Sequence, residues 1–111
     1  MKYIRTIDGL DWTIVADIHR RNEISIQKGK YLFFSKYRDE LITLAKEIIR
    51  DFDLVLAKVS VDSRNGNYVL LVYDILSRYK YHLVKYGNQN VQYRYWKANL
   101  NEDKKDERIY I

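Results

Sequence analysis

The chain has 111 residues, 47% of them hydrophobic and 32% charged, which is typical of one globular domain with one core. It has no cysteine and only two histidines, His19 and His82, without ligand spacing typical of zinc, so neither a metal nor a cofactor is expected. The net charge of +5 favours an acidic partner, and no apolar run suits a signal peptide or a membrane span, so a cytoplasmic protein without membrane contact is expected.

Residues 3–16 are predicted to form a β-hairpin. Asp8-Gly9 is the dipeptide that supplies the two positive-φ positions of a two-residue turn. In that register Arg5 lies opposite Trp12, and a cation–π contact between the two is expected.

A connection and a third strand follow. Residues 17–22 break the alternation and are expected to form the connection, whereas residues 23–34 return to strand character. Gly29 within this strand indicates a bulge or a close approach to the backbone.

The clearest helix signal covers residues 37–52. Seven apolar residues recur there at helical spacing and form one broad stripe: Leu41, Ile42, Leu44, Ala45, Ile48, Ile49 and Phe52. Ser35 is the candidate N-cap, and Asp39 and Glu40 favour the positive end of the helix dipole. A single apolar stripe predicts that the helix covers one side of a sheet.

A second hairpin, residues 54–75, is predicted to turn at Asn65-Gly66. Alternation makes Val59 a core residue. It places Lys58 and Tyr73 opposite one another on the other face of the hairpin, which is only partly covered.

Residues 76–86 are predicted to form a second helix that stops at Gly87, and VQYRYWKANL, residues 91–100, to form the last strand. The expected fold is α+β, a single antiparallel sheet with two helices packed on one face in the order β-β-β-α-β-β-α-β. Residues 1–100 form the domain, and residues 101–111 are a charged C-terminal tail. The second face of the sheet then has no helix to cover it.

The last strand raises the main functional question. Alternation places Tyr93, Tyr95 and Lys97 on one face and Trp96 on the other. Trp96 has the larger apolar area and is expected to face the helices, so the tyrosines face outward. Aromatic rings flanked by lysine on an open sheet are typical of proteins that bind single-stranded RNA. Tyrosine also suits a half-buried strand surface or a partner interface, and these alternatives stay open.

Basic residues elsewhere extend this candidate site. His19-Arg20-Arg21 in a loop suits phosphate, because paired guanidinium groups match phosphate oxygens, although such a run is also typical of a solvated surface. Trp12 is a further candidate for stacking on a ligand, or a packing residue. The residues predicted to bind nucleic acid are Lys58, Tyr73, Tyr93, Tyr95, Lys97, Arg20 and Arg21.

From Gly29 to Lys97 the chain resembles the UPF0696 (Bles03-like) family. The similar segments are GKYLFF before the first helix, LVLAKVS after it, YVLLVYD in the hairpin and YRYWKA in the last strand. The resemblance implies a fold similar to that of the cap-binding translation factors, a curved antiparallel sheet backed by helices. It implies little about activity, although some members carry the label phosphothreonine-lyase-like. The chain departs from the family after the last strand, where it has NLNEDKKDE.

Lyase chemistry would need a base, an acid and a phosphate-binding cation. The only candidates are Lys58 as base, His82 as acid and Arg94 as phosphate clamp. Alternation places Arg94 on the face that the helices cover, which argues against this set.

These observations predict a small basic non-enzymatic binding protein for RNA or single-stranded nucleic acid. The alternatives are an accessory or inhibitor protein that binds another protein, or a homodimer, through the same face, and then the lyase-like enzyme. The absence of proline beside many isoleucines, lysines, tyrosines and glutamates is typical of proteins from hot-living archaea and their viruses.

Overall fold

The computed structural model describes residues 2–98, except for the side chain of Tyr95. In chain order the elements are β1 (Ile4–Asp8), β2 (Trp12–Asp17), the 3-10 helix η1 (Ile18–Ile26), β3 (Gly29–Ser35), α1 (Arg38–Asp51), β4 (Leu56–Ser60), β5 (Tyr68–Asp74), the 3-10 helix η2 (Leu83–Tyr86) and β6 (Val91–Ala98). The predicted tail, residues 101–111, lies outside the described residues, as does the end of the predicted last strand.

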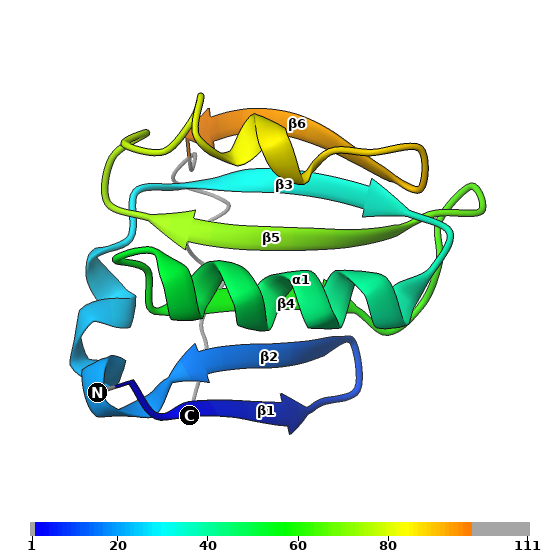
Figure 1. Ribbon diagram of the computed structural model, residues 1–111. Coiled ribbons are helices and arrows are strands. Elements are labelled where there is room, and N and C mark those ends of the chain that lie inside the picture. The colour runs from blue at the N-terminus through cyan, green and yellow to red at the C-terminus, as the bar shows by residue number, and fades with distance from the viewer. Residues whose placement is uncertain (1, 99–111) are drawn as a thin grey trace.

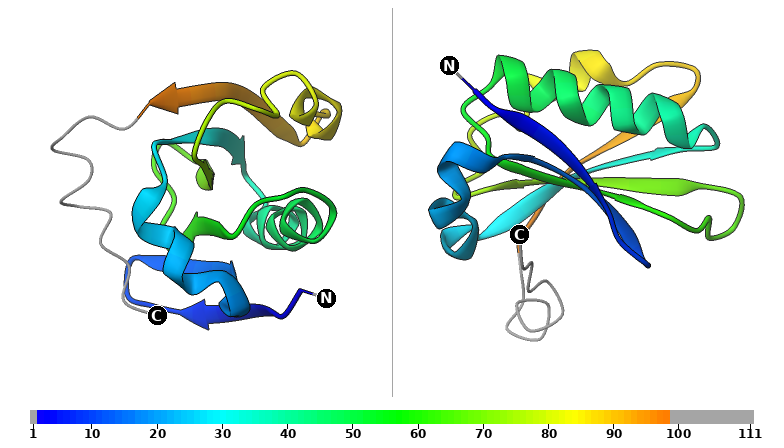
Figure 2. Two further views of the ribbon diagram at one scale, coloured as in Figure 1. Left: turned by 90° about the vertical axis from the view of Figure 1, so that its left-hand side faces the viewer. Right: turned by 90° about the horizontal axis from the view of Figure 1, so that it is seen from below.

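The strands form one antiparallel sheet in the order β1-β2-β4-β5-β3-β6. α1 and η2 lie on the same face of this sheet (Figure 1), and η1 lies at one end of it (Figure 2). The predicted α+β class with one antiparallel sheet is confirmed. The predicted order of elements is wrong in detail, because it lacks η1.

The second predicted helix is also shorter than expected, since only Leu83–Tyr86 are helical, and in 3-10 form. Tertiary hydrogen bonds explain this difference. The Tyr79 N–H donates to the hydroxyl of Tyr31 at 2.9 Å, and the hydroxyl of Tyr93 donates to the carbonyl of Lys80 at 2.7 Å. The Tyr79 N–H therefore cannot donate to the carbonyl four residues before it, as an α-helix would require, and the Tyr93 hydroxyl holds the chain at Lys80.

The main core lies between α1 and the sheet. The predicted apolar stripe is confirmed, because Leu41, Leu44, Ala45, Ile48 and Ile49 are all buried there. Burying each large aliphatic side chain contributes roughly 1.5–3 kcal/mol, so this contact is the main stabilising feature of the fold. The ammonium group of Lys2 donates to the carbonyl oxygens of Ile49 and Phe52 and so satisfies the end of α1.

The last strand differs from its predicted pattern. Trp96 packs against the main core as expected, with its ring 5.2 Å from that of Tyr31. The prediction that Tyr93 faces away from the helices is wrong, since its ring lies 4.8 Å from that of Phe33 in the same core. The cause is a β-bulge, where the pairing of β3 with β6 shifts between Lys30 and Leu32. An extra residue breaks strict alternation, so Tyr93 and Trp96 share one face.

Both hairpin registers differ from prediction. In the first hairpin the Gly9 N–H donates to the Trp12 carbonyl at 2.9 Å, so the turn lies at Leu10-Asp11 and the predicted turn at Asp8-Gly9 is wrong. Arg5 consequently pairs with Ala16 instead of Trp12. In the second hairpin Asn65-Gly66 does form the turn, with positive φ at both residues, as predicted.

Beyond this turn the second hairpin is irregular. Lys58 therefore pairs with Leu71, two residues from the predicted partner Tyr73. A shift of two residues leaves every side chain on its predicted face, because side chains alternate with a period of two.

Candidate functional site

The sheet face opposite α1, here called the open face, carries three rows of side chains across the strands. The first row is Trp12, Ser60, Val69, Phe34 and Gln92. The second row is Ile14, Lys58, Leu71, Leu32 and Arg94. The third row is Ala16, Leu56, Tyr73, Lys30 and Lys97. The rows bring together rings and cations that lie far apart in the sequence.

Cations lie over aromatic rings on this face. The Lys58 Nζ is 5.0 Å from the ring centroid of Trp12 and 5.5 Å from that of Tyr73, and the Lys30 Nζ is 6.0 Å from Tyr73. The guanidinium carbon of Arg94 lies 5.0 Å from the centroid of Phe34. Each contact contributes roughly 0.5–2 kcal/mol. These contacts hold the positive charges over the sheet.

The open face differs in exposure from one end to the other. In the second and third rows Lys58 is 4% exposed and Tyr73 only 2%. Ile24 of η1 packs against the apolar cluster that contains Tyr73. In the first row, by contrast, the rings of Trp12 and Phe34 are only half-buried. A ligand that approaches the open face therefore meets the rings of the first row, together with the exposed Arg94 and Lys97 at the β6 end of the other two rows.

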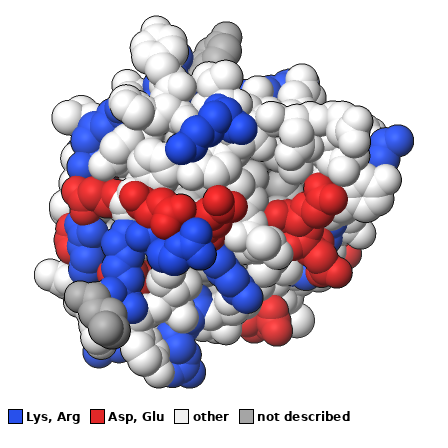
Figure 3. All heavy atoms as spheres, in the orientation of Figure 1, with Lys and Arg blue, Asp and Glu red and all other residues white. Residues whose placement is uncertain are grey.

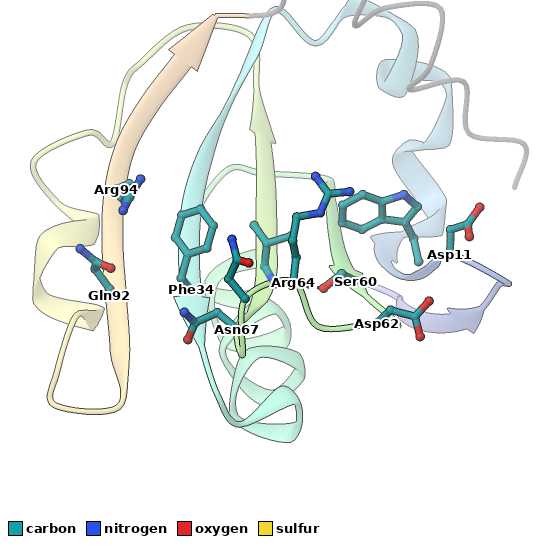
Figure 4. A pocket seen from close by; sticks show the side chains of 11 residues that line it. Asp11, Phe34, Ser60, Asp62, Arg64, Asn67, Gln92 and Arg94 are labelled. Carbon is teal, nitrogen blue, oxygen red and sulfur yellow. Dashed lines mark hydrogen bonds between the residues drawn. The ribbon is translucent and has the colours of Figure 1, made fainter.

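A groove of about 640 Å³ lies along this first row. It is lined by Asp11, Trp12, Phe34, Ser60, Asp62, Arg64, Asn65, Asn67, Val69, Gln92 and Arg94. Figure 4 shows Phe34 on β3 and Gln92 and Arg94 on β6 at one side, with Asp11 and Asp62 at the other and Arg64 reaching across between them. The groove thus has Phe34 and Arg94 at one end, and Trp12 beside the two carboxylates at the other.

The Asn65-Gly66 turn positions Arg64. The backbone N–H of Arg64 donates to the Asn67 carbonyl at 2.8 Å, and the Asn67 N–H donates to the Arg64 carbonyl at 3.1 Å. Gly66 has φ +82°, a conformation that L side chains rarely adopt. Within residues 2–98 neither the Arg64 nor the Arg94 guanidinium forms an ion pair. Both are therefore placed to meet an anionic ligand.

The residues predicted to bind nucleic acid are only partly brought together. Lys58 and Tyr73 lie on the open face, although both are buried, and Lys97 is exposed beside them. Tyr93 lies on the helix-covered face, and the side chain of Tyr95 is outside the described residues.

The two arginines of the predicted phosphate-binding loop lie in η1. Arg20 forms ion pairs with Glu23 and Asp53, both at 2.6 Å, whereas Arg21 is exposed. The pairing supplies Arg20 with a structural role. On the side of the molecule that carries α1 and η2, acidic and basic side chains lie next to one another (Figure 3). This mixed charge does not favour the binding of a polyanion on that side.

The residues of the lyase hypothesis do not meet. Arg94 lies on the open face, contrary to the prediction, because the pairing of Leu32 with Arg94 fixes its side. Lys58 is in the same row, three strand spacings or roughly 14 Å away. His82 lies on the helix side, with its ring 6.0 Å from that of Tyr79, a residue that packs against the main core. The sheet separates His82 from the other two groups.

Sequence reasoning missed Phe34, Arg64 and Gln92 as groove residues. The signal for Phe34 was present, because alternation in GKYLFF places it on the face opposite Phe33. Arg64 stands directly before the Asn65-Gly66 turn, but only the fold shows that it reaches over the sheet.

Comparison with known proteins found no matching family model, no matching curated protein and no matching solved structure. The resemblance to the UPF0696 family therefore stays a prediction. In the part of the chain that the structure describes, no helix is long and apolar enough to cross a membrane, and no cluster of His, Asp and Glu suits a metal ion.

Proposed function

We propose that the protein is a small non-enzymatic binding protein that holds single-stranded nucleic acid, RNA above all, in the groove of the open face. One observation carries this proposal. The groove combines two half-buried rings, Trp12 and Phe34, with two guanidinium groups, Arg64 and Arg94, that have no ion pair among residues 2–98. Aromatic platforms beside basic groups are the usual means of binding single strands.

The rings supply stacking surfaces for bases. Each base stacked on a ring contributes roughly 1–3 kcal/mol, whichever base it is. The rings of Trp12 and Phe34 are three strand spacings apart, or roughly 14 Å. This distance is too long for a sandwich around one base, so the two rings hold different bases of one strand.

The arginines hold the phosphates. Arg94 covers Phe34 in the free protein. A base that stacks on Phe34 displaces the guanidinium, which then pairs with a phosphate, and the planar guanidinium suits two phosphate oxygens. Asp11 and Asp62 repel phosphate from the other end of the groove, so the backbone of the strand runs along the side of Arg64 and Arg94.

Titration of a fluorescently labelled single-stranded RNA, followed by anisotropy at about 50 and 200 mM salt, tests the proposal. We expect affinity to fall with salt, and the slope of log K against log salt to drop by about 0.7 when Arg94→Ala or Arg64→Ala removes one phosphate contact. Phe34→Ala should weaken binding about tenfold with little change in the slope, because stacking does not release counterions.

Arg21→Ala is the matched control. Arg21 is an exposed arginine in η1, outside the groove. Its removal lowers the net charge by the same amount as Arg94→Ala and should leave the affinity nearly unchanged. If no RNA binds, or if Arg21→Ala weakens binding as much as Arg94→Ala does, the groove is not a nucleic-acid site.

A further inference from the structure

The outer edge of β6 is a second candidate binding surface, because backbone groups there have no neighbouring strand in the described part of the chain. β6 is the last strand of the sheet. The N–H of Val91 donates to the Asn88 side chain at 3.0 Å and its carbonyl accepts from the Asn88 N–H at 2.8 Å, so Val91 turns both groups away from β3. Because these directions alternate along a strand, Tyr93 also turns its N–H and carbonyl outward. Among residues 2–98, no turn or loop forms a backbone hydrogen bond with either group.

An apolar pocket lies directly beside this edge. It has a volume of about 430 Å³ and is lined by Lys80, Tyr81, Val84, Gly87, Asn88, Val91 and Tyr93. Two of its apolar side chains are turned to solvent, since Tyr81 is 80% exposed and Val84 is 55% exposed. Exposed apolar groups next to an unpaired strand edge are typical of a site that takes another chain.

The other side of β6 is basic. Arg94 and Lys97 are both exposed and belong to the open face. A strand added to β6 would therefore meet an apolar pocket on one side and positive charge on the other. Because side chains of a strand alternate between the two sides, the chain that fits has apolar and acidic residues in alternation.

We propose that β6 binds an extended, alternately apolar and acidic peptide of a partner protein, which adds to the sheet as a seventh strand. Backbone hydrogen bonds to Tyr93 supply affinity, and the pocket and the two cations supply specificity. A second copy of this chain fits less well, because antiparallel pairing of two β6 strands about a two-fold axis places Arg94 and Lys97 of both copies on the same face of the joined sheet. The proposal does not depend on nucleic-acid binding.

Fluorescence anisotropy with three labelled nine-residue peptides tests this inference on the full chain. The first peptide alternates glutamate and valine, the second has the same composition in two blocks, and the third is the alternating peptide with N-methyl groups on every second residue. We expect the first to bind and the other two to bind at least about tenfold more weakly, because one loses the alternation and the other loses hydrogen-bond donors.

Two substitutions at exposed apolar residues localise the site. Val84→Asp should weaken binding of the alternating peptide about tenfold, because it places a carboxylate in the pocket. Leu10→Asp is the control, since Leu10 is 93% exposed in the loop between β1 and β2, and it should leave binding unchanged.

Equal binding of the alternating and block peptides, or unchanged binding by Val84→Asp, would overturn the proposal. Sedimentation of the free protein as a dimer that Val84→Asp dissociates would also overturn it, because the edge would then serve a second copy.

Discussion

Gly29 has no side chain, and this absence determines how β6 packs. A Cβ at this position would lie within 3.0 Å of three atoms of the Trp96 ring. The expectation of a close approach at Gly29 is therefore confirmed, but the neighbour is a side chain from the last strand. Gly29 pairs with Ala98 beside the bulge of β6, so the indole occupies the space that a larger residue would fill.

We predict that Gly29→Ala lowers the free energy of unfolding by about 1–3 kcal/mol, because the added methyl group forces the Trp96 ring out of position. Urea unfolding measures the change. Trp96→Leu in the same background should remove most of this penalty, so the two substitutions should show a coupling energy in a double-mutant cycle. Additive effects would show that the methyl group is accommodated without contact to the indole.

Among the elements, η1 is held in place by ion pairs. Asp53, in the connection between α1 and β4, accepts from Arg20 of η1 at 2.6 Å and from Arg78 after β5 at 2.9 Å. Arg78 also donates to the buried carboxylate of Asp74 at 2.7 Å. Hydrogen bonds from Arg78 and then Arg20 hold the pKa of Asp53 below its ordinary value. One carboxylate thus connects three segments that lie far apart in the sequence.

This arrangement predicts a loss of stability in acid. The pKa of Asp53 is lower in the folded state than in the unfolded chain, so its contribution is present above the unfolded pKa and is lost as pH falls through the folded pKa. We expect thermal denaturation between about pH 5 and pH 2 to show a smaller fall in Tm for Asp53→Asn than for the unmodified protein. Asp62→Asn, which removes an exposed carboxylate, should leave the profile unchanged. An unaltered profile for Asp53→Asn would contradict the prediction.

At the scale of the whole molecule, the sheet separates two unlike surfaces. One side is covered by α1 and η2, and the core beneath them contains two tyrosine hydroxyls that form hydrogen bonds. The Tyr31 hydroxyl donates to Asp74 at 2.6 Å, and the Tyr93 hydroxyl donates to the Lys80 carbonyl. Burial raises the pKa of both phenols, and that of Tyr93 reaches about 12. The other side has the groove, with its rings and arginines at the surface.

The whole fold should therefore unfold in alkali. Because the folded pKa of Tyr93 lies above the unfolded value of 10.0, its contribution is complete below that value and is lost as pH rises toward about 12. Tyrosinate absorbance and circular dichroism, followed together, should show exposed phenols ionising first and Tyr93 only with unfolding. Tyr93→Phe should move the unfolding to higher pH, whereas Tyr37→Phe, at a 53% exposed residue, should not. Ionisation of every phenol before unfolding would contradict this.

Local patterns in the sequence were enough to determine the α+β class, α1, the turn at Asn65-Gly66 and the side of the sheet on which Lys58 and Tyr73 lie. Each of these depends on residues close together in the chain, through helical spacing, alternation or positive-φ preference. Only the tertiary structure decided the face of Tyr93, the short form of η2 and the groove that joins Trp12 to Arg94. These features depend on a bulge, on hydrogen bonds between distant residues and on the order of strands. A local sequence pattern does not determine how one strand is placed against another.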